Sequence, residues 1–268
     1  MQPEHDTRES GLAGRHGCLY LVPGPLDHGC ASQAPLTDVL PQQTLAVAAR
    51  LTHWISENAR STRAFLKRVD ALVPLARPLQ EIEITELPRA AHKHGDHGTT
   101  GARFDARALL APALEGHDIG LASEAGMPAI ADPGSSVVRA AHVLGLAVRP
   151  LVGPVSLLLA LAASGLNGQN FAFVGYLPQQ PEARQQRIRA LEQHARRSGQ
   201  TQLFIEAPYR NRALLQALLQ TLQPDTRLAV ASGLTLPEAQ VRSEPVQQWR
   251  RQPALASERL PAIFAIGA

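Results

Sequence analysis

Short apolar runs alternate along the chain with stretches in which apolar residues recur at a helical period. The runs at residues 18–22, 118–122 and 147–152 are typical of buried strands, because each has the length of one strand and ends at turn-forming residues. The stretches at residues 58–69 and 137–144 have the spacing of helices. Strands that alternate with helices predict an α/β fold.

The same reasoning predicts the other elements. Strands are expected at residues 53–56, 81–85, 171–176, 202–206, 227–232 and 261–267, with residues 240–246 as a hairpin partner. Helices are expected at residues 44–51, 103–114, 156–164, 181–197 and 211–222.

A break in composition at Gly165-Leu166-Asn167-Gly168 separates two such alternating halves. We therefore expect two α/β domains, at residues 17–165 and 166–268. Residues 1–16 mix acidic, basic and polar groups and are predicted to be a disordered tail.

Composition narrows the class of protein. A hydrophobic fraction of 44% is enough for a packed core and excludes wholesale disorder. The longest apolar run, at residues 155–163, is far shorter than the roughly 20 residues that span a bilayer. The first sixteen residues lack the apolar segment of a secretory signal, and Cys18 and Cys30 form no disulfide framework. We expect a cytoplasmic protein that does not cross a membrane.

Charge adds little by itself, because a formal net charge of +3 on 268 residues does not indicate nucleic-acid binding. Seven arginines between residues 184 and 212 either contact RNA phosphates or form a solvated helix face. His92, His94, His97 and Asp96 lie in a glycine-rich stretch without fixed ligand geometry, so no metal site is predicted.

Glycine and proline occur together after three predicted strands, at residues 22–25, 125–128 and 152–154. In open α/β sheets ligands bind beyond the carboxyl ends of strands, and glycine lets a ligand approach the backbone closely. None of these turns matches GxGxxG or a P-loop, so a dinucleotide or nucleoside triphosphate site of those kinds is not expected.

The segment from Leu121 to Leu166, LASEAGMPAIADPGSSVVRAAHVLGLAVRPLVGPVSLLLALAASGL, resembles the core of the tetrapyrrole methylase family. It is most similar to the branch that methylates a cytidine ribose 2′-hydroxyl of small-subunit ribosomal RNA. Shorter matches occur at residues 19–26, 57–62, 173–178 and 206–210, so the resemblance extends over about residues 18 to 235.

This resemblance implies two α/β domains with a cofactor cleft between them, S-adenosylmethionine as the cofactor, and a homodimer. The cofactor-binding residues that it implies are Pro23, Gly24, Pro25, Leu26, Ser123, Glu124, Ala125, Gly126, Met127, Pro128, Ala131, Ser156 and Leu157. Glu57 and Arg60 are the catalytic candidates. Glu57 follows a predicted strand and is either a general base or a structural acid paired with Arg60.

Several charged positions of the branch pattern differ here. The E-D-T-R-H-T motif of the branch corresponds to Glu57–Thr62, where Asn58 replaces the aspartate and Ser61 replaces the histidine. In the SDAG motif, Glu124 replaces the aspartate. In the R-E-L-T-K motif, Gly233 replaces the glutamate and Leu236 replaces the lysine. We predict an S-adenosylmethionine-dependent methyltransferase that acts on RNA or the ribosomal subunit. The alternatives are a methyltransferase of a small molecule or tetrapyrrole, and a non-catalytic cofactor-binding descendant.

Overall fold

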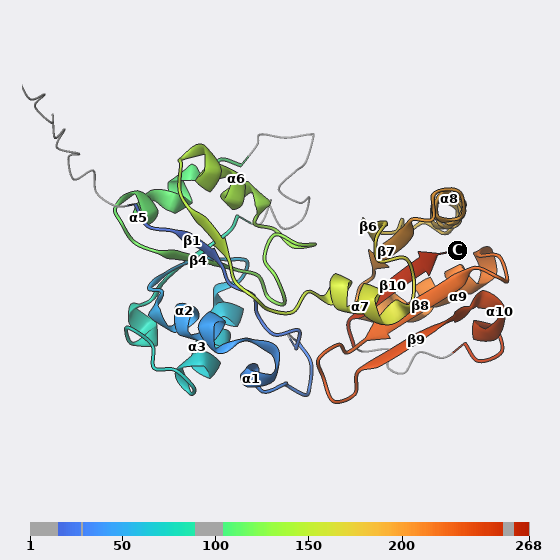
Figure 1. Ribbon diagram of the computed structural model, residues 1–268, viewed down its shortest axis with the longest axis horizontal. Coiled ribbons are helices and arrows are strands. Elements are labelled where there is room, and N and C mark those ends of the chain that lie inside the picture. The colour runs from blue at the N-terminus through green and yellow to red at the C-terminus, as the bar shows by residue number, and fades with distance from the viewer. Residues whose placement is uncertain (1–15, 28, 89–103, 254–259, 268) are drawn as a thin grey trace, which may run out of the picture. The chain divides into compact units, whose positions relative to one another are not determined.

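The computed structural model describes residues 16–27, 29–88, 104–253 and 260–267, which form two compact units (Figure 1). Unit 1 comprises the described residues up to Val22, Leu45–Ser123 and Asp132–Leu151. Unit 2 comprises Pro23–Thr44, Glu124–Ala131 and the described residues from Val152 onward. The predicted tail, apart from His16, and the predicted histidine-rich loop lie outside the described residues.

Unit 1 is built on a sheet of five parallel strands in the order β3-β2-β4-β1-β5. Parallel strands need crossover connections, which helices and 3-10 turns provide here. The strands are β1 (Leu19–Leu21), β2 (His53–Ser56), β3 (Glu83–Glu86), β4 (Ile119–Ala122) and β5 (Val148–Pro150). The helices are α2 (Gln42–Arg50), α3 (Ala59–Asp70), α5 (Ala111–Leu114) and α6 (Ser135–Val143), with 3-10 turns η1 (Leu79–Glu81) and η2 (Ala106–Leu110).

One predicted element of unit 1 has a different form. A single helix was expected at residues 103–114, but a 3-10 turn (η2) precedes a four-residue α-helix (α5). Pro112 lies in the first turn of α5, where its missing N–H removes no helical hydrogen bond, and it cannot lie within a longer helix. The α-helix therefore begins only at Ala111.

The centre of the unit 1 sheet is tightly packed around a tryptophan. The side chain of Trp54 on β2 is 2% exposed, and its indole nitrogen donates a hydrogen bond to the carbonyl of Leu51 at 3.2 Å. Gly120 faces it from β4, and a Cβ atom at that position would lie 2.7 Å from the indole ring. Trp54 is thus part of the core and no platform for a stacked ligand.

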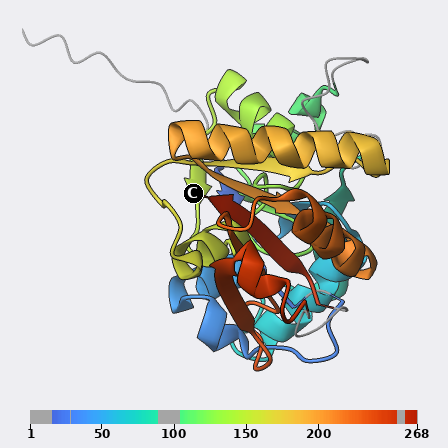
Figure 2. The same ribbon diagram turned by 90° about the vertical axis from the view of Figure 1, so that its right-hand side faces the viewer.

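Unit 2 contains a mixed sheet of five strands in the order β6-β7-β10-β8-β9 (Figure 2). Strand β6 (Phe171–Tyr176) is parallel to β7 (Thr201–Ile205). Strand β10 (Ala262–Gly267) is antiparallel to β7 and to β8 (Arg227–Ser232). Strand β9 (Gln240–Pro245) pairs antiparallel with β8, which confirms the predicted hairpin partner.

Helices cover both faces of this sheet, and the alternation of side chains along the strands separates two cores. Phe264 and Ile266 of β10 are buried with α8 (Pro181–Ser198), α9 (Asn211–Thr221) and α10 (Val246–Trp249). Ile263 and Ala265 are buried on the other face with α7 (Ser156–Ser164). Short turns α1 (Leu36–Val39) and η3 (Pro208–Arg210) complete the unit.

The division into units differs from the one expected at residue 165. Helix α7 ends at Ser164 but packs against β8, β9 and β10, because its buried face matches the apolar face of that sheet. Two further segments, Pro23–Thr44 and Glu124–Ala131, also belong to unit 2. Each is entered just after a strand of unit 1 ends.

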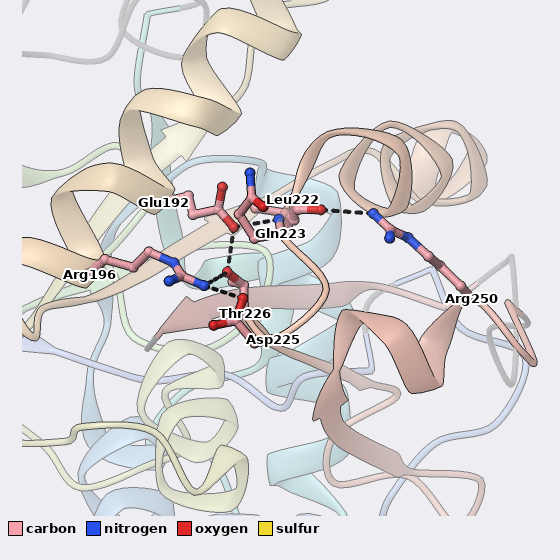
Figure 3. A network of polar contacts seen from close by, with 7 residues as sticks. All are labelled: Glu192, Arg196, Leu222, Gln223, Asp225, Thr226 and Arg250. Atoms are coloured by element: carbon pink, nitrogen blue, oxygen red, sulfur yellow. Dashed lines mark hydrogen bonds and ion pairs between the residues drawn. The ribbon is translucent and has the colours of Figure 1, made fainter.

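A buried carboxylate fixes the connection between α9 and β8 (Figure 3). Glu192 on α8 accepts hydrogen bonds from the backbone N–H of Gln223, at 2.8 Å, and from the hydroxyl of Thr226. Arg196, one turn further along α8, forms an ion pair with Asp225, and its hydrogen bond lowers the pKa of that carboxyl group. We call these five residues the carboxylate network.

Among the described residues, no helix has both the length and the apolar character needed to cross a membrane.

Candidate functional site

Three glycine- and proline-containing turns meet in unit 2, and we call residues 23–26, 124–128 and 153–157 the turn cluster. Gly24 and Gly126 form a two-way backbone bridge. The N–H of Gly24 donates to the carbonyl of Gly126 at 2.9 Å, and the reverse hydrogen bond measures 3.2 Å. The first two turns are therefore joined through their backbones, although a hundred residues separate them in sequence.

The third turn contacts both of the others. A Cβ atom at Gly126 would lie 3.1 Å from a methyl group of Leu26 and 3.4 Å from the carbonyl oxygen of Pro154. A Cβ atom at Gly153 would lie 2.3 Å from the ring of Pro23. A side chain at Gly153 is thus excluded by Pro23, and one at Gly126 would require its neighbours to shift, so the turns approach one another through their backbones.

The loop after β4 is held in a strained conformation. Ala129 and Ala131 have φ angles of 65° and 62°, and Gly126 has a φ of 69°. Residues with a Cβ atom rarely adopt this left-handed region, and such outliers concentrate at ligand-binding segments. Ser123, which begins the loop, is 8% exposed, and its hydroxyl has no hydrogen-bond partner within the described ranges. Such an orphaned polar group is typical of a place where a ligand supplies the partner.

The predicted cofactor-contacting residues do not all present a side chain. Pro23, Gly24 and Pro25 are buried, whereas Leu26, Glu124, Ala125 and Met127 are partly accessible. Ser156 begins α7 and is partly accessible, but the side chain of Leu157 packs in the core against the sheet of unit 2. Leu157 can offer a ligand its backbone only.

Glu57 lies where strand β2 ends in unit 1. Its backbone N–H donates a hydrogen bond to the carbonyl of Ala122 at 3.1 Å, which holds Glu57 beside the carboxyl end of β4. Ala122 directly precedes Ser123. The parallel sheet thus brings a carboxylate and the orphaned hydroxyl to neighbouring strand ends, as the position of Glu57 in the sequence predicted.

The replaced residues of the E-D-T-R-H-T pattern cap helix α3. The side chain of Asn58 is the N-cap and accepts hydrogen bonds from the backbone N–H groups of Arg60, at 2.9 Å, and Ser61, at 3.4 Å. The hydroxyl of Ser61 donates back to the carbonyl of Asn58 at 2.8 Å. Asparagine and aspartate are both favoured N-cap residues, so the change to Asn58 keeps the structural role.

Arg60 does not pair with Glu57. Its side chain is exposed, and the guanidinium forms no ion pair with any carboxylate in the part of the chain that the structure describes. An ion pair between Glu57 and Arg60 is therefore not observed among the described residues, and the roles of Glu57 as a general base and as a structural acid both stay predictions. The first turn of α3 is stabilised by its cap and by Glu86, which accepts a hydrogen bond from the N–H of Ala59 at 2.7 Å.

The two departures after β8 are explained by local packing. Gly233 has a φ of 60°, and a Cβ atom there would lie 2.7 Å from a methyl group of Leu260. Leu236 is 4% exposed and donates its backbone N–H to the carbonyl of Gly233 at 2.9 Å. Between them, Thr235 has a φ of 71° and a buried hydroxyl without a partner among the described residues. No sequence pattern indicates this conformation of Thr235, because threonine rarely adopts a positive φ.

The arginines of residues 184–212 are partly structural. Arg184 donates to the carbonyl oxygens of Pro178 and Gln179, Arg196 pairs with Asp225, and Arg210 pairs with the buried carboxylate of Glu206 at 2.7 Å. The exposed side chains of Arg187, Arg189 and Arg197 on α8 form no ion pair within the described ranges. They remain available to an anionic partner.

Comparison with known proteins decides the family. A profile of the tetrapyrrole (corrin/porphyrin) methylases matches residues 60–249. The chain belongs to the tetrapyrrole methylase family. This methylase is therefore a methyltransferase that depends on S-adenosylmethionine, as predicted from the residues of the Leu121–Leu166 segment.

The methylase has curated relatives that act on ribosomal RNA by name. It is 37% identical over 221 residues to the ribosomal RNA small subunit methyltransferase I of Synechocystis sp., an alignment that covers 82% of this chain and 67% of that protein. It is 29% identical to the Pseudomonas aeruginosa protein of the same name, with 87% and 71% covered. The chain spans 61 to 71% of the length of such relatives.

The fold of the methylase also matches solved structures. The methyltransferase CobJ superposes with a TM-score of 0.51 at 19% sequence identity, and the match covers 94% of each chain. At this identity the likeness concerns the fold alone, and it confirms the predicted α/β class.

Proposed function

We propose that this methylase transfers a methyl group from S-adenosylmethionine to a ribose 2′-hydroxyl of small-subunit ribosomal RNA. The observation that carries the proposal is the similarity, at 29 to 37% identity, to relatives named for that RNA. The turn cluster supports the part of the proposal that concerns cofactor binding. The position of Glu57 supports a hydroxyl group as the methyl acceptor. The alternative is a tetrapyrrole or another small molecule as the substrate, and a methyl-transfer assay distinguishes it from RNA.

The turn cluster suits the cofactor. S-adenosylmethionine carries an adenine, a carboxylate and a sulfonium-activated methyl group, and it needs close backbone approach and hydrogen bonds more than metal or phosphate ligands. Gly24 and Gly126 keep the turn surface free of side chains, and the orphaned hydroxyl of Ser123 offers a donor. The other residues that we assign to cofactor binding are Pro23, Pro25, Leu26, Glu124, Ala125, Met127, Pro128, Ala131, Ser156 and the backbone of Leu157.

Glu57 is the residue that we assign to the substrate hydroxyl. In an in-line displacement the ribose oxygen forms a bond to the methyl carbon as the carbon–sulfur bond breaks, and the hydroxyl proton must leave. We assign the acceptance of that proton to the carboxylate of Glu57, whose backbone is held beside the end of β4 by its hydrogen bond to Ala122. We assign to Arg60, an exposed residue in the first turn of α3, the orientation of an RNA phosphate.

Assembly and location follow from the same proposal. A homodimer is expected from the family resemblance, and sedimentation analysis of the purified protein tests it. Mature and assembling ribosomal subunits are found in the cytoplasm of bacteria, so a cytoplasmic methylase is expected.

A methyl-transfer assay tests the proposal. Purified protein is incubated with tritiated S-adenosylmethionine and, separately, with small-subunit particles, naked ribosomal RNA and a tetrapyrrole substrate. We expect label in RNA that resists alkaline hydrolysis at one phosphodiester bond, the signature of a 2′-O-methyl group. Label in the tetrapyrrole alone would support the alternative substrate. Cofactor binding by calorimetry without label in any acceptor would support the non-catalytic descendant.

A further inference from the structure

A hollow of about 580 Å³ opens in unit 1 at the edge where the parallel strands begin. Cys18 precedes β1, Thr52 precedes β2, Asp118 precedes β4, and Arg149 lies in β5. The carboxyl ends of β1 and β4 lead instead to the turn cluster. The hollow therefore lies at the opposite edge of the sheet from those ends, and the proposed methyl transfer does not use it.

Two guanidinium groups lie over one buried aromatic ring in this hollow. The Cζ atoms of Arg50 and Arg149 are 4.9 and 6.0 Å from the ring centroid of Tyr20. Tyr20 is 5% exposed and pairs in register with Arg149 across β1 and β5. The Tyr20 ring favours these positions of the two guanidinium groups, because a cation–π contact is attractive over the face of the ring.

The only carboxylate among the residues that line the hollow is already compensated. Asp118 accepts a hydrogen bond from Arg50 at 2.7 Å through one oxygen and from the backbone N–H of Cys18 at 2.9 Å through the other. Burial of Arg50 opposes its charge, but the hydrogen bonds with Asp118 and Tyr20 outweigh burial and raise its pKa. Arg149 forms no ion pair within the described ranges, so no carboxylate there neutralises its positive charge.

Histidines add further hydrogen-bond donors. His16 and His117 line the hollow, and the ring of His117 stacks on that of His53 at a centroid distance of 4.6 Å. His53 is held in turn by a contact of 3.1 Å between its Nδ1 atom and the hydroxyl of Thr52. A neutral imidazole offers one N–H group, so the residues that line the hollow include donors besides Arg149 even without histidine protonation.

We propose that this hollow binds a phosphate group, with Arg149 as its principal ligand. A planar guanidinium matches phosphate oxygens in two parallel hydrogen bonds, and an uncompensated cation in a recess attracts an anion more strongly than one on a flat surface. Two sources share this chemistry. One is a backbone phosphate of a bound RNA, which rests on the proposed function, and the other is a free phosphate-bearing metabolite.

The Arg149→Ala variant tests the site, with Arg139→Ala as the matched control. Arg139 is an exposed arginine of α6 in the same unit and does not line the hollow. Both changes remove one exposed charge, so both variants should keep the parent melting temperature. Filter binding measures affinity for small-subunit ribosomal RNA at several salt concentrations, and calorimetry measures affinity for inorganic pyrophosphate.

We expect Arg149→Ala to weaken RNA binding about tenfold and to lower the salt slope by about one, as the loss of one phosphate contact does. The methyl-transfer rate at saturating RNA and the affinity for S-adenosylmethionine should equal those of the parent. A loss of pyrophosphate binding with RNA affinity unchanged would identify a free phosphate compound as the ligand. Pyrophosphate binding tests the hollow even if the parent protein methylates no RNA. Failure of the proposed function is therefore distinguished from failure of the phosphate site.

The proposal is overturned if Arg149→Ala and Arg139→Ala bind both RNA and pyrophosphate equally well. An Arg149→Glu variant guards against a small effect, because charge reversal should weaken binding by clearly more than the tenfold of neutralisation. Equal binding by all three variants leaves no role for the hollow in phosphate recognition.

Discussion

The turn cluster and the carboxylate network both join distant segments of unit 2, but they do so by opposite means. The turn cluster uses the backbone bridge between Gly24 and Gly126, and the loop that includes its residues 124–128 has two alanines at positive φ and begins at the orphaned buried hydroxyl of Ser123. In the carboxylate network, Glu192 accepts two hydrogen bonds and Arg196 is paired with Asp225 (Figure 3). Strain and an unsatisfied polar group reduce stability, and both are common in segments that bind a ligand.

We therefore propose that the turn cluster binds the cofactor and that the carboxylate network stabilises the fold. A third region, the end of β2 with Glu57, lies between these extremes. Its helix cap is formed by Asn58, and Glu57 lies at the end of β2, where its backbone N–H is bonded to Ala122. Variants in each region should therefore change different measurements.

The largest effect is expected for Gly126→Val. A β-branched side chain resists the φ of 69° and would fill the space beside Leu26 and Pro154, so the affinity for S-adenosylmethionine should fall by about 10³-fold or more. Isothermal titration measures the loss. Some loss of stability is also expected from the strained backbone, at about 1–2 kcal/mol.

Gly145→Val is the matched control for that strain. Gly145 has the same φ of 69°, follows α6 in unit 1, and has no atom within 4 Å of an added Cβ. It should lower the melting temperature as Gly126→Val does while it binds the cofactor like the parent. Equal affinity in both variants would remove the turn cluster from the binding site.

Glu57→Gln should change the rate and leave binding unchanged. Loss of a general base costs about 10² to 10⁴ in rate, so single-turnover methyl transfer should slow within that range. Glu86→Gln is the control, because Glu86 ends the neighbouring strand β3 and only holds the N–H of Ala59. A Glu57→Gln rate within threefold of the parent excludes Glu57 from the mechanism.

The fold was predictable where apolar runs are bounded by turn residues. Strands β6 and β8 and helix α7 begin and end where the pattern placed them, because glycine or proline marks their limits and their apolar faces meet a core. Helices α1 and α10 were missed, since four residues after a proline are too few to show a helical period.

The site was predictable in its parts more than in its assembly. That glycine turns at strand ends converge follows from the rule for parallel sheets. The Gly24–Gly126 bridge joins the segments Pro23–Thr44 and Glu124–Ala131, which both belong to unit 2, and no local sequence pattern encodes it. The hollow around Tyr20 was not foreseen either, because it gathers residues from the starts of four strands.

Glu192→Ala should reduce stability without affecting the site. Removal of the buried carboxylate leaves the N–H of Gln223 and the hydroxyl of Thr226 without an acceptor, at about 1–3 kcal/mol for each group. Denaturant unfolding should show the loss, with cofactor affinity unchanged. Arg196→Ala, which removes the exposed ion pair with Asp225 and a long hydrogen bond of 3.4 Å to the hydroxyl of Thr226, should reduce stability less than Glu192→Ala does. A larger loss of stability for Arg196→Ala than for Glu192→Ala would contradict the assignment of the network to Glu192.

The smallest effect is expected at Asn58, where a family position that is normally acidic carries an amide. Asn58→Ala removes the acceptor for the N–H groups of Arg60 and Ser61 and should cost about 1 kcal/mol of unfolding free energy. Asn58→Asp keeps the acceptor and adds a negative charge at the positive end of α3, so it should equal or slightly exceed the stability of the parent. Because the side chain is engaged with the helix backbone, neither change should alter the single-turnover rate beyond threefold. An Asn58→Asp variant that methylates RNA more than tenfold faster would show that the lost acid takes part in the chemistry, and the cap alone would then not explain this position.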